Sequence, residues 1–415
     1  MSKLIIEGQH KLNGTIKISG AKNSAVALIP AAILSDEEVE ISNIPNISDI
    51  DALNEILNYL NAKVDRKEHS ITINNEQLNN KEIPESVSTK LRASYYFMGA
   101  LLGKYKKVRM YFPGGCNIGT RPINLHLKAF EALGAKITEK NNLYIIEAKE
   151  LKGTSIYLDI ASVGATINTI LASVKAEGTT IIENAAKEPE IVNVATFLNN
   201  MGAKITGAGT SEIKIIGVKK LKKAKIEVIP DRIEAGTYII AASLIGENVR
   251  IENIIPEHIE ALTLKLKEAN INMNIKEDYI EIKESKNLKA ISIKTSVFPG
   301  FPTDLQQPIA TLLTQCNKRS IIEETIYENR FKNLEYLKKM GAKVKITKQK
   351  AYITGKTELK GKEVEATDLR AGASLVLAGL VAKGTTKIKN IEHILRGYEG
   401  IKEKLESLGA KITIE

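Results

Sequence analysis

The chain has 415 residues, a net charge of +10, 43% hydrophobic residues and 26% charged residues. This length predicts two or more hydrophobic cores, and the composition excludes a largely disordered chain. No apolar run approaches the roughly 18–20 residues of a membrane helix, and Glu7 interrupts the segment in which a signal peptide would continue its apolar stretch. We therefore expect a cytoplasmic protein that makes no contact with a membrane.

The basic residues are mostly lysines, with 49 lysines and only 10 arginines. Each arginine is therefore a candidate for a site that needs a planar, two-pronged donor. A nucleic-acid-binding repeat protein is disfavoured, because aromatic residues make up only 5% and the lysine-rich segment 218–225 has no aromatic ring. Two cysteines and five scattered histidines argue against a disulfide framework and a metal site.

A short phrase of the type Leu-Gly-Ala-Lys-Ile recurs six times along the chain. Its second residue is Gly or Asn at intervals of 73, 68, 68, 71 and 68 residues, at positions 61, 134, 202, 270, 341 and 409. An amphipathic helix precedes the phrase, as at 50–60, and the Gly or Asn is typical of a left-handed helix end. Alternating strands follow, as at 343–346 and 352–354.

A small apolar helix, a polar turn and a strand recur between the phrases, as at 172–184, 241–253 and 375–390. Each unit of about 70 residues therefore reads strand, helix, strand, helix, strand, strand, and predicts helices packed on a sheet. Six units suggest two lobes of three. A duplicated scaffold without a site remains the alternative.

Each unit begins its apolar helix with polar residues that are good N-caps. Capping does not explain the cations Lys22, Arg92, Arg232 and Arg370 in first helical turns, where the macrodipole disfavours them by about 0.3–1 kcal/mol. Bound anions would offset this cost, since helix starts bind phosphate and carboxylate. We expect pseudo-symmetry to bring these starts together as a cleft lined with anion donors.

Loops after the second helical segments add a thiol and further arginines. The glycine-rich segment 114–122 places Cys116 near Arg121, which favours a reactive thiolate over an inert surface cysteine. Glu328-Asn329-Arg330 and Arg396-Gly397-Tyr398-Glu399 occupy matching places in the last two units. Cys316 lies in an apolar run and is predicted to be core, and His126 is a helix-face residue without a strong claim to catalysis.

Six motifs carry a resemblance that runs from Leu4 to the C-terminus. They are Ile18-Ser19-Gly20-Ala21-Lys22-Asn23, Pro113-Gly114-Gly115-Cys116-Asn117-Ile118-Gly119, Ser162-Val163-Gly164-Ala165-Thr166, Glu183-Asn184-Ala185-Ala186-Lys187-Glu188-Pro189-Glu190, Phe301-Pro302-Thr303-Asp304 and Ala366-Thr367-Asp368-Leu369-Arg370-Ala371. In these the chain resembles the UDP-N-acetylglucosamine 1-carboxyvinyltransferase family, the enolpyruvyl transferases of peptidoglycan synthesis. The resemblance implies an α/β inside-out barrel of two lobes, each with three βαβαββ repeats. The lobes would comprise residues 22–229, and residues 1–21 with 230–415.

The resemblance also implies a reaction in which the 3′-hydroxyl of UDP-N-acetylglucosamine adds to phosphoenolpyruvate and the tetrahedral ketal then loses phosphate. Asp304 matches the family's base and Cys116 its acid, which also reacts with the epoxide fosfomycin; Lys22 and Arg396 complete the catalytic set. No metal or cofactor is implied. The expected phosphoenolpyruvate contacts are Lys22, Asn23, Arg121, Arg370 and Arg396. The expected nucleotide-sugar contacts are Asn23, Arg92, Arg121, Pro122, Ile123, Asn124, Leu125, Ser162, Val163, Gly164, Asp304 and Ile326, supported by Arg330, Asp368 and Leu369.

Two residues depart from many relatives. Asn124 stands where they have Asp, and Ile160 where some have Lys, which weakens the expected uracil and phosphate contacts. Two related functions stay open: an enolpyruvyl transferase that uses a shikimate-like acceptor, and a paralogue that binds nucleotide sugar without turnover. The cysteine segment favours the cell-wall enzyme over the first. The presence of Lys22, Cys116, Asp304 and Arg396 argues against the second.

Overall fold

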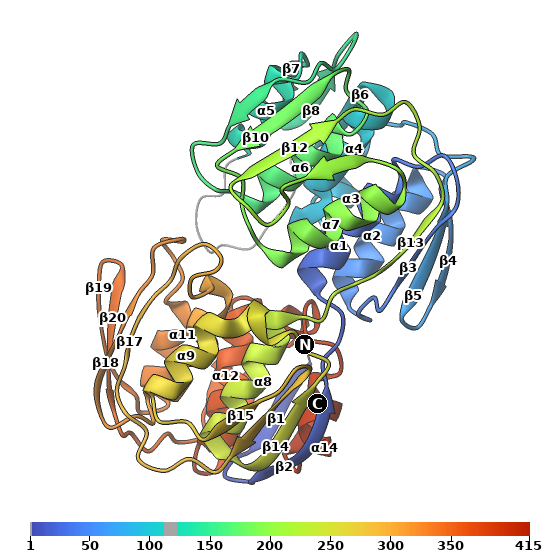
Figure 1. Ribbon diagram of the computed structural model, residues 1–415. Coiled ribbons are helices and arrows are strands. Elements are labelled where there is room, and N and C mark those ends of the chain that lie inside the picture. The colour runs from blue at the N-terminus through green and yellow to red at the C-terminus, as the bar shows by residue number, and fades with distance from the viewer. Residues whose placement is uncertain (1, 112–122) are drawn as a thin grey trace. The chain divides into compact units, whose positions relative to one another are not determined.

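The computed structural model describes residues 2–111 and 123–415, which form two compact units (Figure 1). The central unit comprises residues 20–111 and 123–229, and the terminal unit comprises residues 2–19 and 230–415. Cys116, Arg121 and Pro122 lie outside the described residues. No described helix is long and apolar enough to cross a membrane.

The central unit alternates helices with short strands. Its elements are α1 (Lys22–Ala32), β3 (Val39–Ser42), α2 (Ser48–Tyr59), β4 (Lys63–Lys67), β5 (Ser70–Asn74), α3 (Glu85–Ser88), the 3-10 turn η1 (Arg92–Tyr95), α4 (Tyr96–Tyr105), β6 (Lys107–Tyr111), α5 (Asn124–Ala132), β7 (Lys136–Lys140), β8 (Leu143–Glu147), β9 (Ser155–Tyr157), α6 (Val163–Ser173), β10 (Thr179–Glu183), α7 (Pro189–Asn200), β11 (Lys204–Thr206), β12 (Glu212–Ile216) and β13 (Ala224–Glu227).

The terminal unit repeats the same alternation. Its elements are β1 (Lys3–Glu7), β2 (Leu12–Lys17), α8 (Arg232–Ile245), β14 (Gly246–Glu252), η2 (Pro256–Ile259), α9 (Glu260–Glu268), β15 (Met273–Ile275), β16 (Tyr279–Lys283), β17 (Ser292–Lys294), η3 (Thr303–Leu305), α10 (Gln306–Leu313), β18 (Lys318–Glu323), α11 (Lys332–Lys339), β19 (Lys343–Thr347), β20 (Lys350–Gly355), β21 (Glu363–Glu365), α12 (Leu369–Val381), β22 (Thr385–Lys389), α13 (Glu392–Leu395), α14 (Ile401–Ser407) and β23 (Lys411–Ile414).

The described strands form three sheets in each unit, which confirms the predicted fold of three βαβαββ repeats per lobe. The sheet orders are β13-β3-β5-β4, β6-β8-β7 and β11-β12-β10-β9 in the central unit, and β21-β22-β1-β23, β15-β16-β14-β2 and β17-β18-β20-β19 in the terminal unit. In the third repeat β10 pairs in parallel with β9 and antiparallel with β12. Strands distant in sequence complete three sheets, since β13 pairs in parallel with β3, β2 pairs in parallel with β14, and β1 pairs antiparallel with β22 and β23.

Apolar helices occupy the inside of each unit and the sheets lie outside (Figure 1). In the terminal unit α8, α10 and α12 contact one another, and in the central unit α4 contacts α1 and α6. The small apolar helices predicted in the segments 241–253 and 375–390 correspond to α8 and α12. The described strands stay in separate sheets and do not join into one closed ring. Cys316 is fully buried, as predicted.

The recurring Gly or Asn takes the left-handed conformation in all six repeats. The φ values are 63° at Asn61, 99° at Gly134, 104° at Gly202, 67° at Asn270, 110° at Gly341 and 103° at Gly409. This position reverses the chain from the amphipathic helix into the third strand. The left-handed helix ends predicted from the repeat are therefore confirmed.

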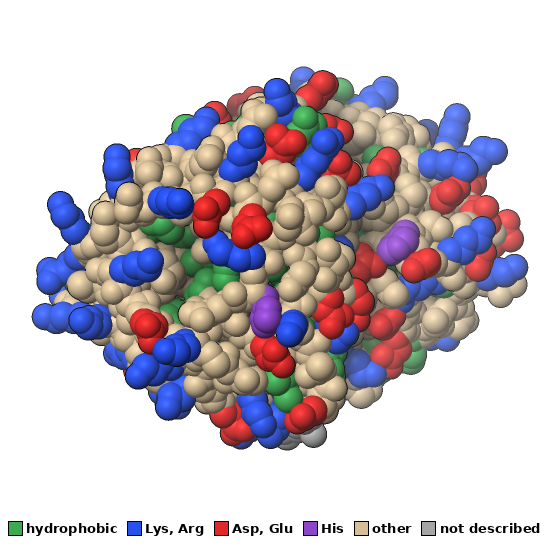
Figure 2. Space-filling model, turned by 90° about the horizontal axis from the view of Figure 1, so that it is seen from below, with side chains coloured by type: hydrophobic (Ala, Val, Ile, Leu, Met, Phe, Trp, Pro, Cys, Tyr) green, Lys and Arg blue, Asp and Glu red, His purple; other side chains and the backbone are tan. Residues whose placement is uncertain are grey.

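Charged side chains of both signs are interspersed on the face in Figure 2. The lysine-rich segment near 220 follows this pattern, because Lys220 lies 3.1 Å from Glu37 and Lys225 lies 2.5 Å from Glu40. Exposed pairs of this kind contribute little to stability. These pairs nevertheless place an acidic side chain beside Lys220 and another beside Lys225.

Substitution of Gly202 tests the backbone requirement at the repeated position. An added Cβ meets no atom within 4 Å there, so Gly202→Ala isolates the cost of the left-handed conformation. We expect Gly202→Ala to lower the free energy of unfolding by about 1–2 kcal/mol. Gly202→Asn should cost less, because Asn already holds this position in two repeats. Urea denaturation measures both, and equal losses would contradict the conformational explanation.

Candidate functional site

Three side chains of the terminal unit form a compact charged cluster. Asp304 Oδ1 accepts a hydrogen bond from Arg330 Nη2 at 2.6 Å, and its Oδ2 accepts one from Arg370 Nη2 at 3.1 Å. The guanidinium groups are almost buried, with 3% and 5% of their side chains exposed, whereas 28% of the Asp304 side chain remains accessible. Two buried guanidinium groups therefore hold one carboxylate that remains partly accessible to solvent.

Asp304 does not cap a helix, since neither η3 nor α10 has a side-chain cap. It is the middle residue of η3, and its carboxylate faces the arginines. Burial raises the pKa of Asp304, but the Arg370 and Arg330 guanidinium groups outweigh burial and hold it well below its usual range. The carboxylate is therefore ionised at neutral pH.

Helix α12 fixes Arg370 through its N-cap. Asp368 Oδ1 accepts hydrogen bonds from the backbone N–H groups of Arg370 and Ala371, both at 3.0 Å. Gln307 Nε2 donates to the Arg330 carbonyl at 3.1 Å and lies 3.5 Å from Asp368 Oδ2, which links α10, α12 and the segment before α11. Leu369 is the first residue of α12. Of the supporting residues, Arg330 belongs to the cluster, Asp368 caps the helix that carries Arg370, and Leu369 begins that helix.

Tyr398 connects Arg370 to the segment that carries Arg396. The Arg370 guanidinium carbon lies 5.2 Å from the Tyr398 ring centroid, and the Tyr398 hydroxyl is 2.9 Å from Thr237 Oγ1 on α8. Arg396 directly follows α13, two residues before this tyrosine. The sequence pattern did not identify Tyr398, because its role depends on the packing of α8 against α12.

The central unit holds Lys22 through a buried carboxylate. Lys22 is the first residue of α1, and its Nζ lies 2.6 Å from Asp49 Oδ2 at the start of α2. The side chain of Asp49 is 3% exposed and that of Lys22 is 14% exposed, so the buried carboxylate fixes the position of the Lys22 ammonium group. Asn23 follows on the same half-buried turn. Asp49 was missed because its partner lies in another helix.

One buried carboxamide joins three helical segments that carry predicted nucleotide-sugar residues. Asn168 of α6 accepts from the Gly99 N–H, donates to the Tyr95 carbonyl at 3.1 Å, and lies 2.8 Å from His126 Nδ1. Since the amide oxygen is used by Gly99, its NH₂ group faces the histidine, and His126 Nδ1 accepts. The joined segments begin near Arg92, Asn124 and Val163.

The start of α6 is capped as expected, because Ser162 Oγ accepts from the Ala165 N–H at 3.3 Å. Val163 and Gly164 form the first turn, and a Cβ at Gly164 would lie 2.8 Å from the Tyr95 hydroxyl. Among the predicted helix starts that the structure describes, the side chains of Asp231 and Asp368 also accept hydrogen bonds from backbone N–H groups. Ser19 and Thr303 do not cap.

The remaining predicted contacts occupy varied environments. Asn124 begins α5 and is exposed, Ile123 is buried, Leu125 is half-buried, and Ile326 is half-buried between β18 and α11. Ile160 is 66% exposed, in the segment before α6. The residues that the structure describes include no group of three or more His, Cys, Asp or Glu suited to a metal.

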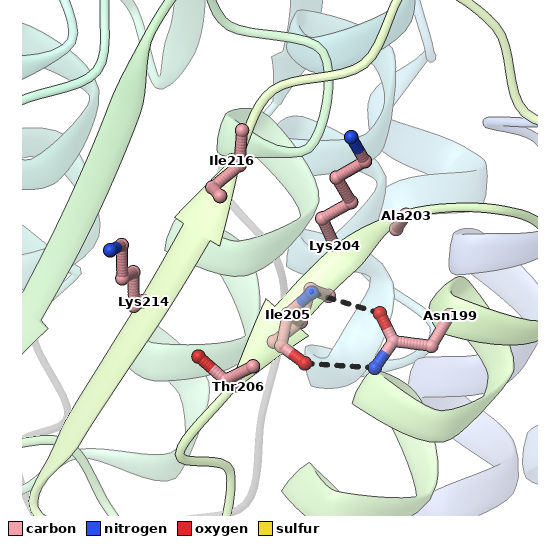
Figure 3. Close-up of a pocket in the computed structure, with 7 residues that line it drawn as sticks. All are labelled: Asn199, Ala203, Lys204, Ile205, Thr206, Lys214 and Ile216. Carbon is pink, nitrogen blue, oxygen red and sulfur yellow. Dashed lines mark hydrogen bonds between the residues drawn. The ribbon is translucent and has the colours of Figure 1, made fainter.

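A surface groove of about 230 Å³ is lined by residues of α7, the edge strand β11 and its neighbour β12 (Figure 3). The Asn199 side chain accepts from the Ile205 N–H and donates to the Ile205 carbonyl, both at 2.9 Å. The asparagine therefore satisfies backbone groups that an edge strand would otherwise offer to another chain. The groove contains no predicted site residue.

His126 makes stability depend on pH. Burial, with a smaller effect of Arg92, lowers the pKa of His126 from 6.5 to about 3. The unfolded chain therefore binds a proton first as the pH falls below 6.5, and the free energy of unfolding decreases toward pH 3. His126→Gln should remove about 2–3 kcal/mol of the loss between pH 7 and 4.5. Denaturant titrations at both pH values measure this difference, and identical losses would contradict it.

Comparison with known proteins places the chain in a family. The model of EPSP synthase (3-phosphoshikimate 1-carboxyvinyltransferase) matches residues 6–405. Two relatives named UDP-N-acetylglucosamine 1-carboxyvinyltransferase 2, from Oceanobacillus iheyensis and Bacillus subtilis, are each 52% identical and align over 100% of this chain and 97% of their own length.

Solved structures agree in fold. The enolpyruvyl transferase NikO from Streptomyces tendae is 25% identical and has a TM-score of 0.91, with 100% of this chain and 99% of that chain covered. An EPSP synthase from Acinetobacter baumannii, 20% identical with a TM-score of 0.77, covers both chains fully and shares the fold. The chain therefore belongs to the carboxyvinyltransferase family that the EPSP synthase model describes.

Proposed function

We propose that the chain transfers the enolpyruvyl group of phosphoenolpyruvate to the 3′-hydroxyl of UDP-N-acetylglucosamine and releases phosphate. This is the first committed step of peptidoglycan precursor synthesis, carried out in the cytoplasm. The full-length similarity to relatives named for this activity supports the choice of acceptor. The observation that carries the chemistry is Asp304, an ionised carboxylate held between Arg330 and Arg370.

Asp304 acts as the general base of the addition step. It takes the proton of the sugar hydroxyl while that oxygen bonds to C2 of phosphoenolpyruvate and C3 receives a proton from Cys116. The C2–O bond to phosphate then breaks and phosphate leaves, while C3 returns a proton to the Cys116 thiolate to regenerate the alkene. Cys116 is also the residue that we expect fosfomycin to alkylate.

The substrate anion adjusts the strength of this base. A carboxylate held by two guanidinium groups is ionised but accepts a proton weakly. If Arg370 turns to the carboxylate or phosphate of phosphoenolpyruvate, Asp304 loses one counter-charge and its pKa rises. Asp304 is therefore a stronger base when phosphoenolpyruvate is bound, which suits general base catalysis.

The remaining residues bind anions and the nucleotide sugar. Lys22, Asn23, Arg121 and Arg396 are proposed to join Arg370 on phosphoenolpyruvate, because Arg and Lys donors suit its two anionic groups. At the start of α6, Ser162 Oγ caps only the Ala165 N–H, and the backbone N–H groups of Val163 and Gly164 suit the diphosphate. Contacts from Arg92, Pro122, Ile123, Asn124, Leu125 and Ile326 complete this proposal. The addition–elimination itself uses no metal or organic cofactor.

Two substitutions test the assignment. Asp304→Asn and Cys116→Ser should each lower kcat/KM for phosphate release by about 10²–10⁴-fold, as expected on loss of a general base or acid. Phosphate release is measured with phosphoenolpyruvate and UDP-N-acetylglucosamine. Asp51→Asn is the matched control, because it removes one carboxylate from an exposed ion pair with Arg66 and should retain activity.

Acceptor choice is tested in the same assay. Wild-type protein that releases phosphate with shikimate 3-phosphate and not with UDP-N-acetylglucosamine would overturn the proposed acceptor. Protein that binds the nucleotide sugar but releases no phosphate would overturn the proposed activity. Full turnover by Asp304→Asn would refute the assignment of the base.

A further inference from the structure

Four of the six repeats share the residue that directly follows the second strand. It is an asparagine with a φ of 55–59° at four positions, namely Asn43, Asn184, Asn253 and Asn390. Each side-chain amide donates one hydrogen bond of 2.7–2.8 Å, to Val228 O, Leu158 O, Ile18 O and Glu365 Oε1 respectively. The position thus normally ties a strand end to a neighbouring segment.

Glu324 occupies this position in the repeat built around α10, directly after β18. It is 1% exposed. Its Oε1 accepts from Thr295 Oγ1 at 2.9 Å, from the Ile326 N–H at 2.8 Å and from the Tyr327 N–H at 3.2 Å. Its Oε2 accepts from Thr303 Oγ1 at 2.9 Å. The carboxylate therefore gathers four donors from three segments.

These segments lead to both sides of the Asp304–Arg330 ion pair. Thr303 begins η3 and immediately precedes Asp304. Tyr327 carries a ring whose centroid lies 5.4 Å from the Arg330 guanidinium carbon. One oxygen of Glu324 thus holds the turn that presents the carboxylate, and the other holds the segment whose ring packs against the arginine.

An asparagine could not replace these contacts. Its NH₂ group would face hydroxyl and amide donors, and its single oxygen would serve fewer of them. Burial of a carboxylate is costly unless its hydrogen bonds are made, and four other repeats close the same corner with a neutral amide. The departure from the repeat pattern therefore requires an explanation beyond the fold.

We propose that Glu324 is a positioning residue for the reaction, which holds Asp304 and Arg330 at hydrogen-bonding distance by fixing Thr303 and Tyr327 together. The inference rests on the proposed function, in which Asp304 is the base. Misplacement of a reacting group by about 1 Å can cost on the order of 10²-fold in rate. Glu324 itself does not touch the substrate.

The test is a double-mutant cycle on kcat. Glu324→Ala should lower kcat by about 10–100-fold and change either KM by less than about threefold, because the base and not the binding of substrates is displaced. In an Asp304→Asn background the same substitution should have little further effect, since a residue that acts through Asp304 loses its influence when the base is absent. Glu324→Gln, which keeps the shape and one of the two acceptor oxygens, should lower kcat less than Glu324→Ala does.

Asn253→Ala is the matched control, because it removes the equivalent tie in another repeat of the same unit. It should lower thermal stability to a similar extent and retain wild-type kcat. Additive effects of Glu324→Ala and Asp304→Asn, or an equal fall in kcat for Asn253→Ala, would reduce Glu324 to a structural role while the proposed function stands. A wild-type protein without activity on either acceptor would overturn both proposals.

Discussion

Two nearly buried guanidinium groups that share one carboxylate are the interaction on which the candidate site depends. Arg330 and Arg370 are charged at every physiological pH, and burial of such a charge is costly unless an anion compensates it. Asp304 supplies that anion and keeps a quarter of its side chain accessible. The carboxylate therefore compensates the buried guanidinium groups, and one of these groups can still exchange Asp304 for an anionic group of a ligand. A neutral residue at 304 would leave the two cations without this compensation.

The repeat architecture explains why the polar groups gather at helix starts. The inner helices are buried along most of their length, as in α6 and α12. Ionised side chains are excluded from such surfaces, so charge can be placed at the first turn or in the segments that follow the strands. Lys22, Arg232 and Arg370 all occupy first turns, and Asp49 or Asp304 compensates two of these cations. Duplication thus supplied equivalent positions at which different chemistry could be placed.

Divergence between the repeats is as informative as their similarity. Four repeats close the corner after the second strand with one asparagine, whereas the repeat beside Asp304 uses a buried carboxylate with four donors. The central unit has its own buried hub in Asn168, which contacts His126 Nδ1 and joins three helical segments. Glu324 and Asn168 each bind segments that carry residues proposed to contact the substrates. Positioning and substrate contact are therefore assigned to different side chains.

The sequence by itself determined the repeat, the order of its elements and the left-handed ends of the second helices. These features follow from local backbone and hydrophobic patterns, which a single chain displays without its partners. It also singled out Arg370, Arg330 and Asp304, and a comparison of residues 43, 184, 253, 324 and 390 would have revealed Glu324. Only the tertiary structure decided which carboxylate meets which cation. Asp49, Tyr398 and Asn168 act through contacts between segments far apart in sequence, and such contacts leave no periodic signal in the chain.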